Sequence, residues 1–251
     1  MRPNRFTLLP RLLSLLLAAL LAPEPPARAQ APEAKELLLD PLTVTATRTP
    51  RPVSTVGDSV EVFTRDRLEL TLPGDFSDLL REGAGINMDQ SGARGATASF
   101  RIRGSESNFG SVLLEGFKIS TPDGDLFDFA HMPVEWLRGA EILRGPQSTL
   151  YGSDAASGVV NLLLDLGRPG EAPSFELGAR LGSFSSSEET LKLKGGWEKG
   201  GYLATVSRVD GQGRFKNDGY YRTAALMAVD HFPGPTAKLR LISLGTPNRR
   251  A

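Results

Sequence analysis

The clearest hydrophobic pattern in the chain is an almost unbroken apolar run at residues 158–164. After Gly158 it contains two valines, Asn161 and three leucines. Apolar runs of this length that begin with β-branched residues are typical of a strand covered on both faces. The run therefore predicts a buried strand inside a compact domain.

Short segments upstream of this run predict the other elements of the same domain. Asp75 precedes an amphipathic turn that Gly83 closes, which predicts a short capped helix. One more helical turn is predicted at residues 148–151, after Pro146. Strands are predicted at residues 59–63, 86–88, 100–104 and 112–116, with residues 137–143 leading into the buried run. Together these elements predict an α+β domain over residues 53–166.

The pattern changes to regular alternation after a linker at residues 167–170. About five alternating segments, separated by turn residues, lie at residues 174–184, 190–197, 202–209, 223–229 and 237–242. Such segments are typical of outer-membrane barrel strands, although a soluble antiparallel meander shows the same alternation. Single-chain bacterial barrels need at least about eight strands. Residues 171–251 therefore predict antiparallel transmembrane strands of an incomplete barrel.

The first 29 residues have the order of a secretory signal peptide. Three arginines precede an apolar stretch at residues 12–22, and the segment ends in Ala27-Arg28-Ala29. This order predicts export and cleavage after Ala29. The alternative is a buried N-terminal helix, which is disfavoured because the prolines at residues 23, 25 and 26 would end it in solvent.

Composition excludes several classes of function. The chain of 251 residues has 29 basic and 29 acidic residues, no cysteine and two histidines. Balanced charge gives no reason to expect nucleic-acid binding, and disulfides and cysteine metal sites are excluded. The chain shows no nucleophile elbow, no metal-binding histidine pair and no nucleotide loop. We therefore expect a binding protein without a cofactor rather than an enzyme.

A linker rich in Pro, Ala and Thr, residues 30–52, contains one extended segment. In residues 40–46, here called the box segment, Leu42, Val44 and Ala46 alternate with threonines, which predicts a strand with one apolar edge. Such a strand can add to the edge of a partner's sheet.

Residues 143–164, LRGPQSTLYGSDAASGVVNLLL, closely resemble the plug-domain signature of TonB-dependent outer-membrane receptors, RGP-x-S-x-x-YG-x-x-A-x-x-GVVN. The matching positions are Arg144, Gly145, Pro146, Ser148, Tyr151, Gly152, Ala155, Gly158, Val159, Val160 and Asn161. A phosphate-binding loop is disfavoured, because the glycines precede a strand and no Gly-Lys-Ser/Thr ending follows. The family's "IRG" and "VLxDGV" motifs correspond to residues 102–104 and 112–117, with Glu115 in place of Asp.

The box segment resembles the family's TonB box, D-T-x-x-V-T-A, with Pro41 in place of Thr. The resemblance implies that a TonB-type periplasmic energy-coupling protein grips this segment, through Asp40, Leu42, Val44, Thr45 and Ala46. It also implies that Arg103 and Arg144 pair with glutamates of a barrel wall. Solvent-exposed capping is the alternative role for these two arginines.

Three loops rich in Gly, Ser and Asn predict a ligand-contacting apex: Gln90–Thr97, Ser105–Gly110 and Thr121–Ala130. The candidate contact residues are Gln90, Ser91, Ser105, Asn108, Phe109 and Phe127, with Phe129 as a further apolar contact. Three aspartates beside Gly124 offer oxygen ligands for Ca²⁺, but the EF-hand pattern is missing, so a solvated turn is favoured and no metal site is predicted. These aspartates are Asp123, Asp125 and Asp128. His131 and Trp136 are predicted to be packing residues.

The combined features predict the plug and first barrel strands of a TonB-dependent receptor in the outer-membrane lipid. The resemblance implies active uptake of a scarce ligand, with the motif order nearest to cobalamin receptors and next to ferric siderophore receptors. The short set of strands is interpreted as the N-terminal part of such a receptor. A secreted periplasmic binding module, or a receptor remnant without transport, is the alternative.

Overall fold

The computed structural model describes residues 41–71, 75–92, 94–119, 127–215, 218–234, 236–246 and 248–250. The predicted signal peptide, Asp40, Asp123 and Asp125 lie outside these residues, as does the side chain of His131. None of the described helices is long and apolar enough to cross a membrane.

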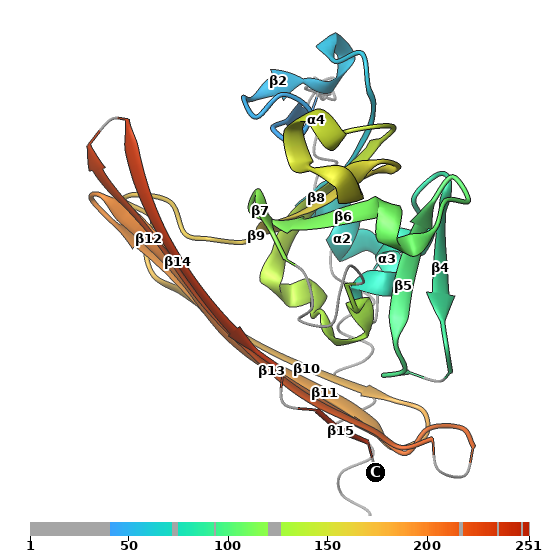
Figure 1. Cartoon of the computed structure of the whole chain (residues 1–251). Coiled ribbons are helices and arrows are strands. Elements are labelled where there is room, and N and C mark those ends of the chain that lie inside the picture. The colour runs from blue at the N-terminus through green and yellow to red at the C-terminus, as the bar shows by residue number, and fades with distance from the viewer. Residues whose placement is uncertain are drawn as a thin grey trace, which may run out of the picture. The chain divides into compact units, whose positions relative to one another are not determined.

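The plug domain is built on a five-stranded sheet with the order β3-β8-β9-β6-β7 (Figure 1). Its strands are β3 (Ser59–Phe63), β6 (Gly110–Leu114), β7 (Phe117–Lys118), β8 (Leu137–Arg144) and β9 (Gly158–Leu164). The pair β6 and β9 is parallel, and the other neighbours are antiparallel. A separate hairpin is formed by β4 (Ile86–Gln90) and β5 (Ala98–Ile102). The helices are α2 (Arg65–Thr71), α3 (Phe76–Arg81) and α4 (Ser148–Tyr151), so the predicted α+β fold is confirmed.

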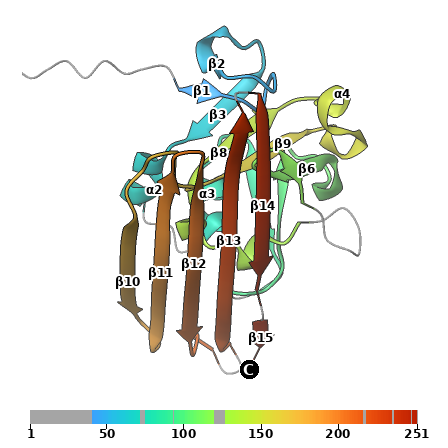
Figure 2. The same cartoon turned by 90° about the vertical axis from the view of Figure 1, so that its left-hand side faces the viewer.

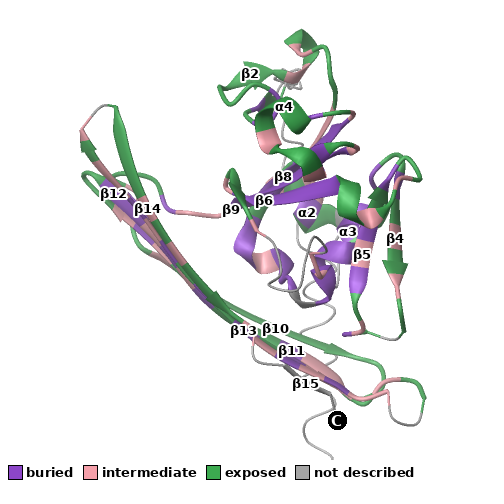
Figure 3. Cartoon of the chain, in the orientation of Figure 1, coloured by how far each residue is buried: buried purple, intermediate pink, exposed green. Residues whose placement is uncertain are grey.

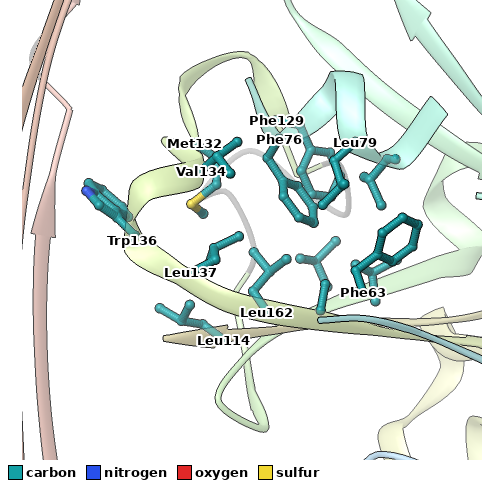
Figure 4. Packing of buried hydrophobic residues seen from close by; sticks show 14 of the residues in the cluster. Phe63, Phe76, Leu79, Leu114, Phe129, Met132, Val134, Trp136, Leu137 and Leu162 are labelled. Carbon is teal, nitrogen blue, oxygen red and sulfur yellow. The ribbon is translucent and has the colours of Figure 1, made fainter. Parts of the chain in front are cut away.

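One face of the plug sheet packs against α2 and α3 and forms the main core. Side chains of alternate strand residues, such as Ile142 and Leu162, belong to the same cluster as Phe76 and Leu79 of α3 (Figure 4). Phe129 is fully buried in this cluster, with its ring centroid 5.6 Å from that of Phe76. The predicted apolar loop contact Phe129 is therefore a core residue, because its neighbours enclose it.

The opposite face of the sheet carries a smaller cluster. Successive side chains on a strand point to opposite faces. Leu113, Leu143 and Val159 therefore point away from the helices and pack with Ala46 and Ala155. This second face is covered by the box segment and by the loop that follows α4, and these lie near β2 (Arg51–Pro52) at the top of Figure 1. The box segment is therefore part of the folded plug.

A second sheet, here called the wall sheet, contains the predicted alternating segments. Its order is β10-β11-β12-β13-β14, all neighbours are antiparallel, and β15 pairs with β13 (Figure 2). The strands are β10 (Ser174–Gly182), β11 (Ser186–Trp197), β12 (Gly200–Gly211), β13 (Tyr220–Gly234), β14 (Ala237–Gly245) and β15 (Asn248–Arg250). The sheet is open, in agreement with the predicted incomplete barrel.

The two faces of the wall sheet differ in polarity. Leu177 and Leu191 are paired on one face and are 76% and 43% exposed. The row through Glu188, Val209 and Arg222 lies on the other face, and all three residues are buried (Figure 3). The outward face therefore carries exposed apolar side chains, whereas the inward face carries buried charged side chains together with apolar ones that join the main core. Exposed apolar side chains on one face are typical of outer-membrane strands, whereas a soluble sheet leaves mainly polar side chains exposed.

Gly158 begins β9 at a point where a side chain has no room. Its φ is 153°, and a Cβ atom there would lie 2.2 Å from the carbonyl oxygen of Leu143.

We expect Gly158→Ala to lower the free energy of unfolding by about 2 kcal/mol or more, because steric overlap adds to a disfavoured backbone conformation. Chemical unfolding followed by tryptophan fluorescence measures the change. Gly57→Ala is the matched control, since no atom lies within 4 Å of its added carbon. Equal losses in the two variants would contradict the prediction.

Candidate functional site

The box segment is held by the carboxylate of Glu141, at the centre of β8. Thr43 Oγ1 donates a hydrogen bond to Glu141 Oε2 at 2.8 Å. The backbone N–H groups of Val44 and Thr45 donate to the same oxygen at 3.0 and 2.7 Å. Glu141 is 2% exposed, so these bonds form away from bulk water. Hydrogen bonds to an ionised acceptor are stronger than neutral ones.

The box segment is a strand over only part of its length. Leu42–Thr43 forms β1, which pairs with β2 (Arg51–Pro52), and the chain then turns. The prediction of a continuous extended segment is therefore wrong beyond Thr43. The physical reason is that two consecutive N–H groups reach one carboxylate only where the backbone curves around it.

Two residues of the plug signature, Tyr151 and Asn161, also bind the box segment. The hydroxyl of Tyr151 donates to the carbonyl oxygen of Thr45 at 2.6 Å, and Asn161 Nδ2 donates to Thr45 Oγ1 at 3.0 Å. Ala46 is 5% exposed and packs with Ala155 and Val159. The two sequence motifs recognised separately are therefore in direct contact.

The Tyr151 hydroxyl is a reliable donor at neutral pH. Burial raises its pKa, against the opposing effect of the Arg48 guanidinium, which lies 5.1 Å from the ring centroid. The phenol therefore stays protonated and keeps its hydrogen bond to Thr45.

Glu141 and Asn161 were not predicted to be functional residues, although each is a polar residue within an apolar segment. Asn161 interrupts an otherwise apolar run, and Glu141 lies between Ala140 and Ile142 in a buried strand. The two polar residues are register partners on neighbouring strands. A polar pair on a buried sheet face requires hydrogen-bond partners, and the box segment supplies them.

Two apolar side chains of the box segment, those of Leu42 and Val44, face outward. Leu42 and Val44 are 58% and 41% exposed, whereas Thr43 and Thr45 are buried. A cavity of about 970 Å³ lies beside them, also lined by Glu141 and by residues of the 165–171 linker. The side chains that a partner strand would read are therefore accessible while the backbone is still held.

Arg144 pairs within the plug. Its guanidinium contacts the carboxylate of Glu61 on β3, and Arg67 Nη1 donates to the other oxygen of Glu61 at 3.0 Å. Arg144 is buried, which disfavours the exposed capping role. Arg103 is exposed at a left-handed position, with φ 52°. Pairing of either arginine with barrel glutamates stays a prediction.

With one exception, each described ion pair between plug and wall sheet joins a plug carboxylate to a wall-sheet base. Asp75 accepts a hydrogen bond from Arg222 at 2.9 Å, and Glu115 accepts one from Arg240 at 2.5 Å. Asp165, after β9, pairs with Lys192. Arg94 and Glu188, 3.9 Å apart, form a longer pair of the opposite polarity.

Two of the three predicted ligand loops lie at opposite ends of one plug strand, β5. The loop with Gln90 and Ser91 precedes β5, whereas the loop with Ser105 follows it, so the two lie at opposite ends of that strand. Asn108 and Phe109 belong to the latter loop and are exposed. Phe127 packs edge-on against Phe129, with centroids 4.8 Å apart. A single apex containing all the candidate residues is therefore not formed, and ligand contact by either loop remains a prediction.

Asp128 serves as a backbone cap. Its Oδ1 accepts hydrogen bonds from the N–H groups of Ala98 and Ala130 at 2.9 and 3.0 Å. In the part of the chain that the structure describes, no group of histidine and carboxylate side chains could hold a metal ion. Trp136 is 1% exposed, as a packing residue requires.

The structure combines a small α+β domain, a curved segment docked on a buried carboxylate, and a wall sheet with buried charges on its inward face. This combination is that of a plug-type receptor domain. Residues 52–159 match the family model for the TonB-dependent Receptor Plug Domain. This stretch of the chain is therefore a plug domain of the kind found in TonB-dependent receptors.

The similar sequences include vitamin B12 transporters. The chain is 34% identical over 198 residues to the vitamin B12 transporter BtuB of Vibrio vulnificus, covering 75% of this chain and 32% of that protein. It is 32% identical over 151 residues to BtuB of Vibrio cholerae O395, covering 60% of this chain and 24% of the relative. The chain thus spans no more than about a third of the length of these relatives.

Similar solved structures share the fold. The pyoverdine receptor FpvA of Pseudomonas aeruginosa superposes with a TM-score of 0.63 at 17% identity, over 82% of this chain and 30% of that one. The siderophore receptor PirA of Acinetobacter baumannii gives 0.60 at 22% identity, over 75% and 32%. These structures support the plug and the first wall strands.

The Glu61 carboxylate makes stability depend on pH. Burial raises its pKa, but hydrogen bonds and positive charge from Arg144 and Arg67 outweigh burial and hold the pKa below its ordinary value. The stabilisation is therefore present above the pKa of about 4.3 in the unfolded chain and is lost as pH falls through the pKa in the folded protein.

We expect Glu61→Gln to be less stable than the parent at pH 7 and to lose less stability in acid. Chemical unfolding at several pH values tests this, with Glu69→Gln, in an exposed pair with Arg65, as control. Parallel pH curves for Glu61→Gln and the parent would contradict it.

Removing the Glu141 charge should free the box segment. The chain has no cysteine, so Ala46→Cys is a unique probe that is buried when the segment is docked. We expect Glu141→Ala to raise the maleimide labelling rate of this cysteine by about two orders of magnitude or more, up to the rate of an exposed cysteine, because three charged hydrogen bonds are lost.

Two reporters control the labelling experiment. Leu70→Cys, 84% exposed, gives the rate for open access, and Ala140→Cys, in the main core, reports global unfolding. Glu106→Gln, in an exposed loop, is the matched glutamate control. If Glu141→Ala leaves labelling of the Ala46→Cys probe unchanged, the carboxylate does not hold the segment.

Proposed function

We propose that the protein is an outer-membrane receptor that imports a scarce ligand and is driven by a periplasmic energy-coupling protein of the TonB type. The observation that carries the proposal is the docking of the box segment on Glu141. Three donors of the segment meet one carboxylate, while Leu42 and Val44 stay exposed. Such a segment can leave the plug without disturbing the helix-covered core and then pair with a partner's sheet edge.

The polarity of the wall sheet supports location in the outer membrane. The central rows of its outward face are apolar, and its inward rows contain buried charges, including Glu188 and Arg222. Lipid suits the first face, and a plug with its own charged groups suits the second. A secreted module with a soluble meander would place its apolar rows inward. Export by the predicted signal peptide is part of the same proposal.

We propose cobalamin-type compounds as the ligand class, because the vitamin B12 transporters are similar at 34% and 32% identity. Ferric siderophores are the second class. The solved siderophore receptors support the fold, but at 17% and 22% identity they carry no argument for a ligand.

Removal of the box segment should affect uptake of the ligand but not its binding at the cell surface. The full reading frame is expressed in cells that lack an outer-membrane vitamin B12 transporter, and surface binding and uptake of radiolabelled cyanocobalamin are measured. We expect deletion of residues 41–46 to abolish uptake and to leave surface binding intact, because the deletion removes the segment on which the partner pulls. Thr47→Ala, an exposed change just outside the segment, is the control.

Two outcomes would contradict different parts of this proposal. Surface binding of a ferric siderophore without binding of cyanocobalamin would overturn the ligand class. Uptake that survives the deletion would overturn the role of the box segment.

A further inference from the structure

Glu115 occupies a turn position that its backbone disfavours. Glu115 and Gly116 form the two-residue connection between β6 and β7, with φ of 52° and 86°. Hairpin turns with two left-handed residues favour Asn or Asp followed by Gly, because other side chains are less tolerated there. The longer glutamate therefore needs a reason that lies in its side chain.

Both oxygens of the Glu115 carboxylate are used. Oε1 accepts a hydrogen bond from the N–H of Leu164 at 2.6 Å, at the end of β9. Oε2 accepts one from Arg240 Nη1 at 2.5 Å, and both side chains of this pair are at most 10% exposed. Arg240 on β14 also donates two hydrogen bonds, of 2.5 and 2.6 Å, to the carboxylate of Asp230 on β13. Glu115 thereby ties the turn to the plug sheet and to two strands of the wall sheet.

The same turn orients the residue that holds the box segment. The N–H of Gly116 donates to Asn161 Oδ1 at 2.9 Å, and Asn161 Nδ2 donates to Thr45 Oγ1 at 3.0 Å. An amide side chain offers its oxygen on one side and its NH₂ on the other. The Gly116 donor therefore selects the amide orientation in which Asn161 presents a donor to Thr45.

We propose that the Glu115–Arg240 pair is a positioning pair that couples the wall sheet to retention of the box segment. This inference rests on the proposed function, in which the box segment is held and then released. While Arg240 holds Glu115, the turn keeps Asn161 oriented and Thr45 bound. When a movement of β13 and β14 withdraws Arg240, the strained turn relaxes and Thr45 loses its donor. The fold thus supplies a continuous hydrogen-bonded route from the wall sheet to the box segment.

The experiment measures maleimide labelling of Ala46→Cys in the full-length protein within outer-membrane vesicles. Glu115→Gln keeps the side-chain length and an acceptor for Leu164 but removes the charge, and we expect it to raise the labelling rate about fivefold or more. Glu115→Asp suits the turn better but is too short to reach both partners. It should label faster while its thermal stability stays equal to or above that of the parent, a combination that a purely structural role does not give.

Matched variants isolate the pair from the rest of its cluster. Lys238→Met removes a charge 3.0 Å from Asp230 without touching Glu115, and its labelling should match the parent. Arg240→Met should label as fast as Glu115→Gln, and the double variant should add nothing further, because one interaction is lost in all three. Ala140→Cys in each background reports global loosening and should stay unlabelled.

Each result decides between specific alternatives. Parent-like labelling in both Glu115 variants overturns the coupling, and so does an equal rise at the Ala140→Cys reporter. If Glu141→Ala raises labelling of the Ala46→Cys probe while the Glu115 variants do not, docking of the box segment stands and only the coupling fails. If Glu141→Ala also has no effect, docking as assumed under the proposed function fails as well.

Discussion

The plug depends on one constraint, which is that the buried carboxylate of Glu141 must have hydrogen-bond donors. It lies on a sheet face whose other buried residues are apolar apart from its register partner Asn161 and Ser111. An unpaired charge in such a place costs several kcal/mol. Thr43, Val44 and Thr45 supply the donors, so the face is complete only while the box segment is docked. The helix-covered face is closed by apolar packing instead, so the two faces of one sheet are completed by different kinds of contact.

Buried charged groups also need hydrogen-bonding partners where the plug contacts the wall sheet. The plug keeps the basic residue of its signature, Arg144, for Glu61 and offers carboxylates to the wall sheet instead. Asp75 and Glu115 meet arginines that are themselves buried on the inward face. Because each of these charges is desolvated, its partner must be close and well oriented, and the plug is thereby fixed in register with the strands.

The sequence was sufficient for the features that repeat along the chain. Alternation predicted the wall strands, and the apolar run predicted β9 because burial on both faces leaves that pattern. Features set by one side chain were not predictable. The turn after Thr43 follows from the position of Glu141, almost a hundred residues away in sequence. Helix α2 was missed because its short sequence buries Leu68 but leaves Leu70 exposed, so no helical periodicity is visible. The ends at which loops lie depend on strand direction, which composition does not encode.

The free energy of docking of the box segment is a small difference between two large contributions, the hydrogen bonds gained and the backbone entropy lost. Three hydrogen bonds to a charged acceptor contribute about 1.5–3 kcal/mol each, and the bonds from Tyr151 and Asn161 about 0.5–1.5 kcal/mol each. Fixing the backbone of residues 41–46 costs about 1–2 kcal/mol per residue. The two totals cancel to within a few kcal/mol. A segment held so narrowly stays docked only while all its donors are aligned. Loss of one hydrogen bond, such as that from Asn161 to Thr45, therefore shifts its population substantially without any change in the main core.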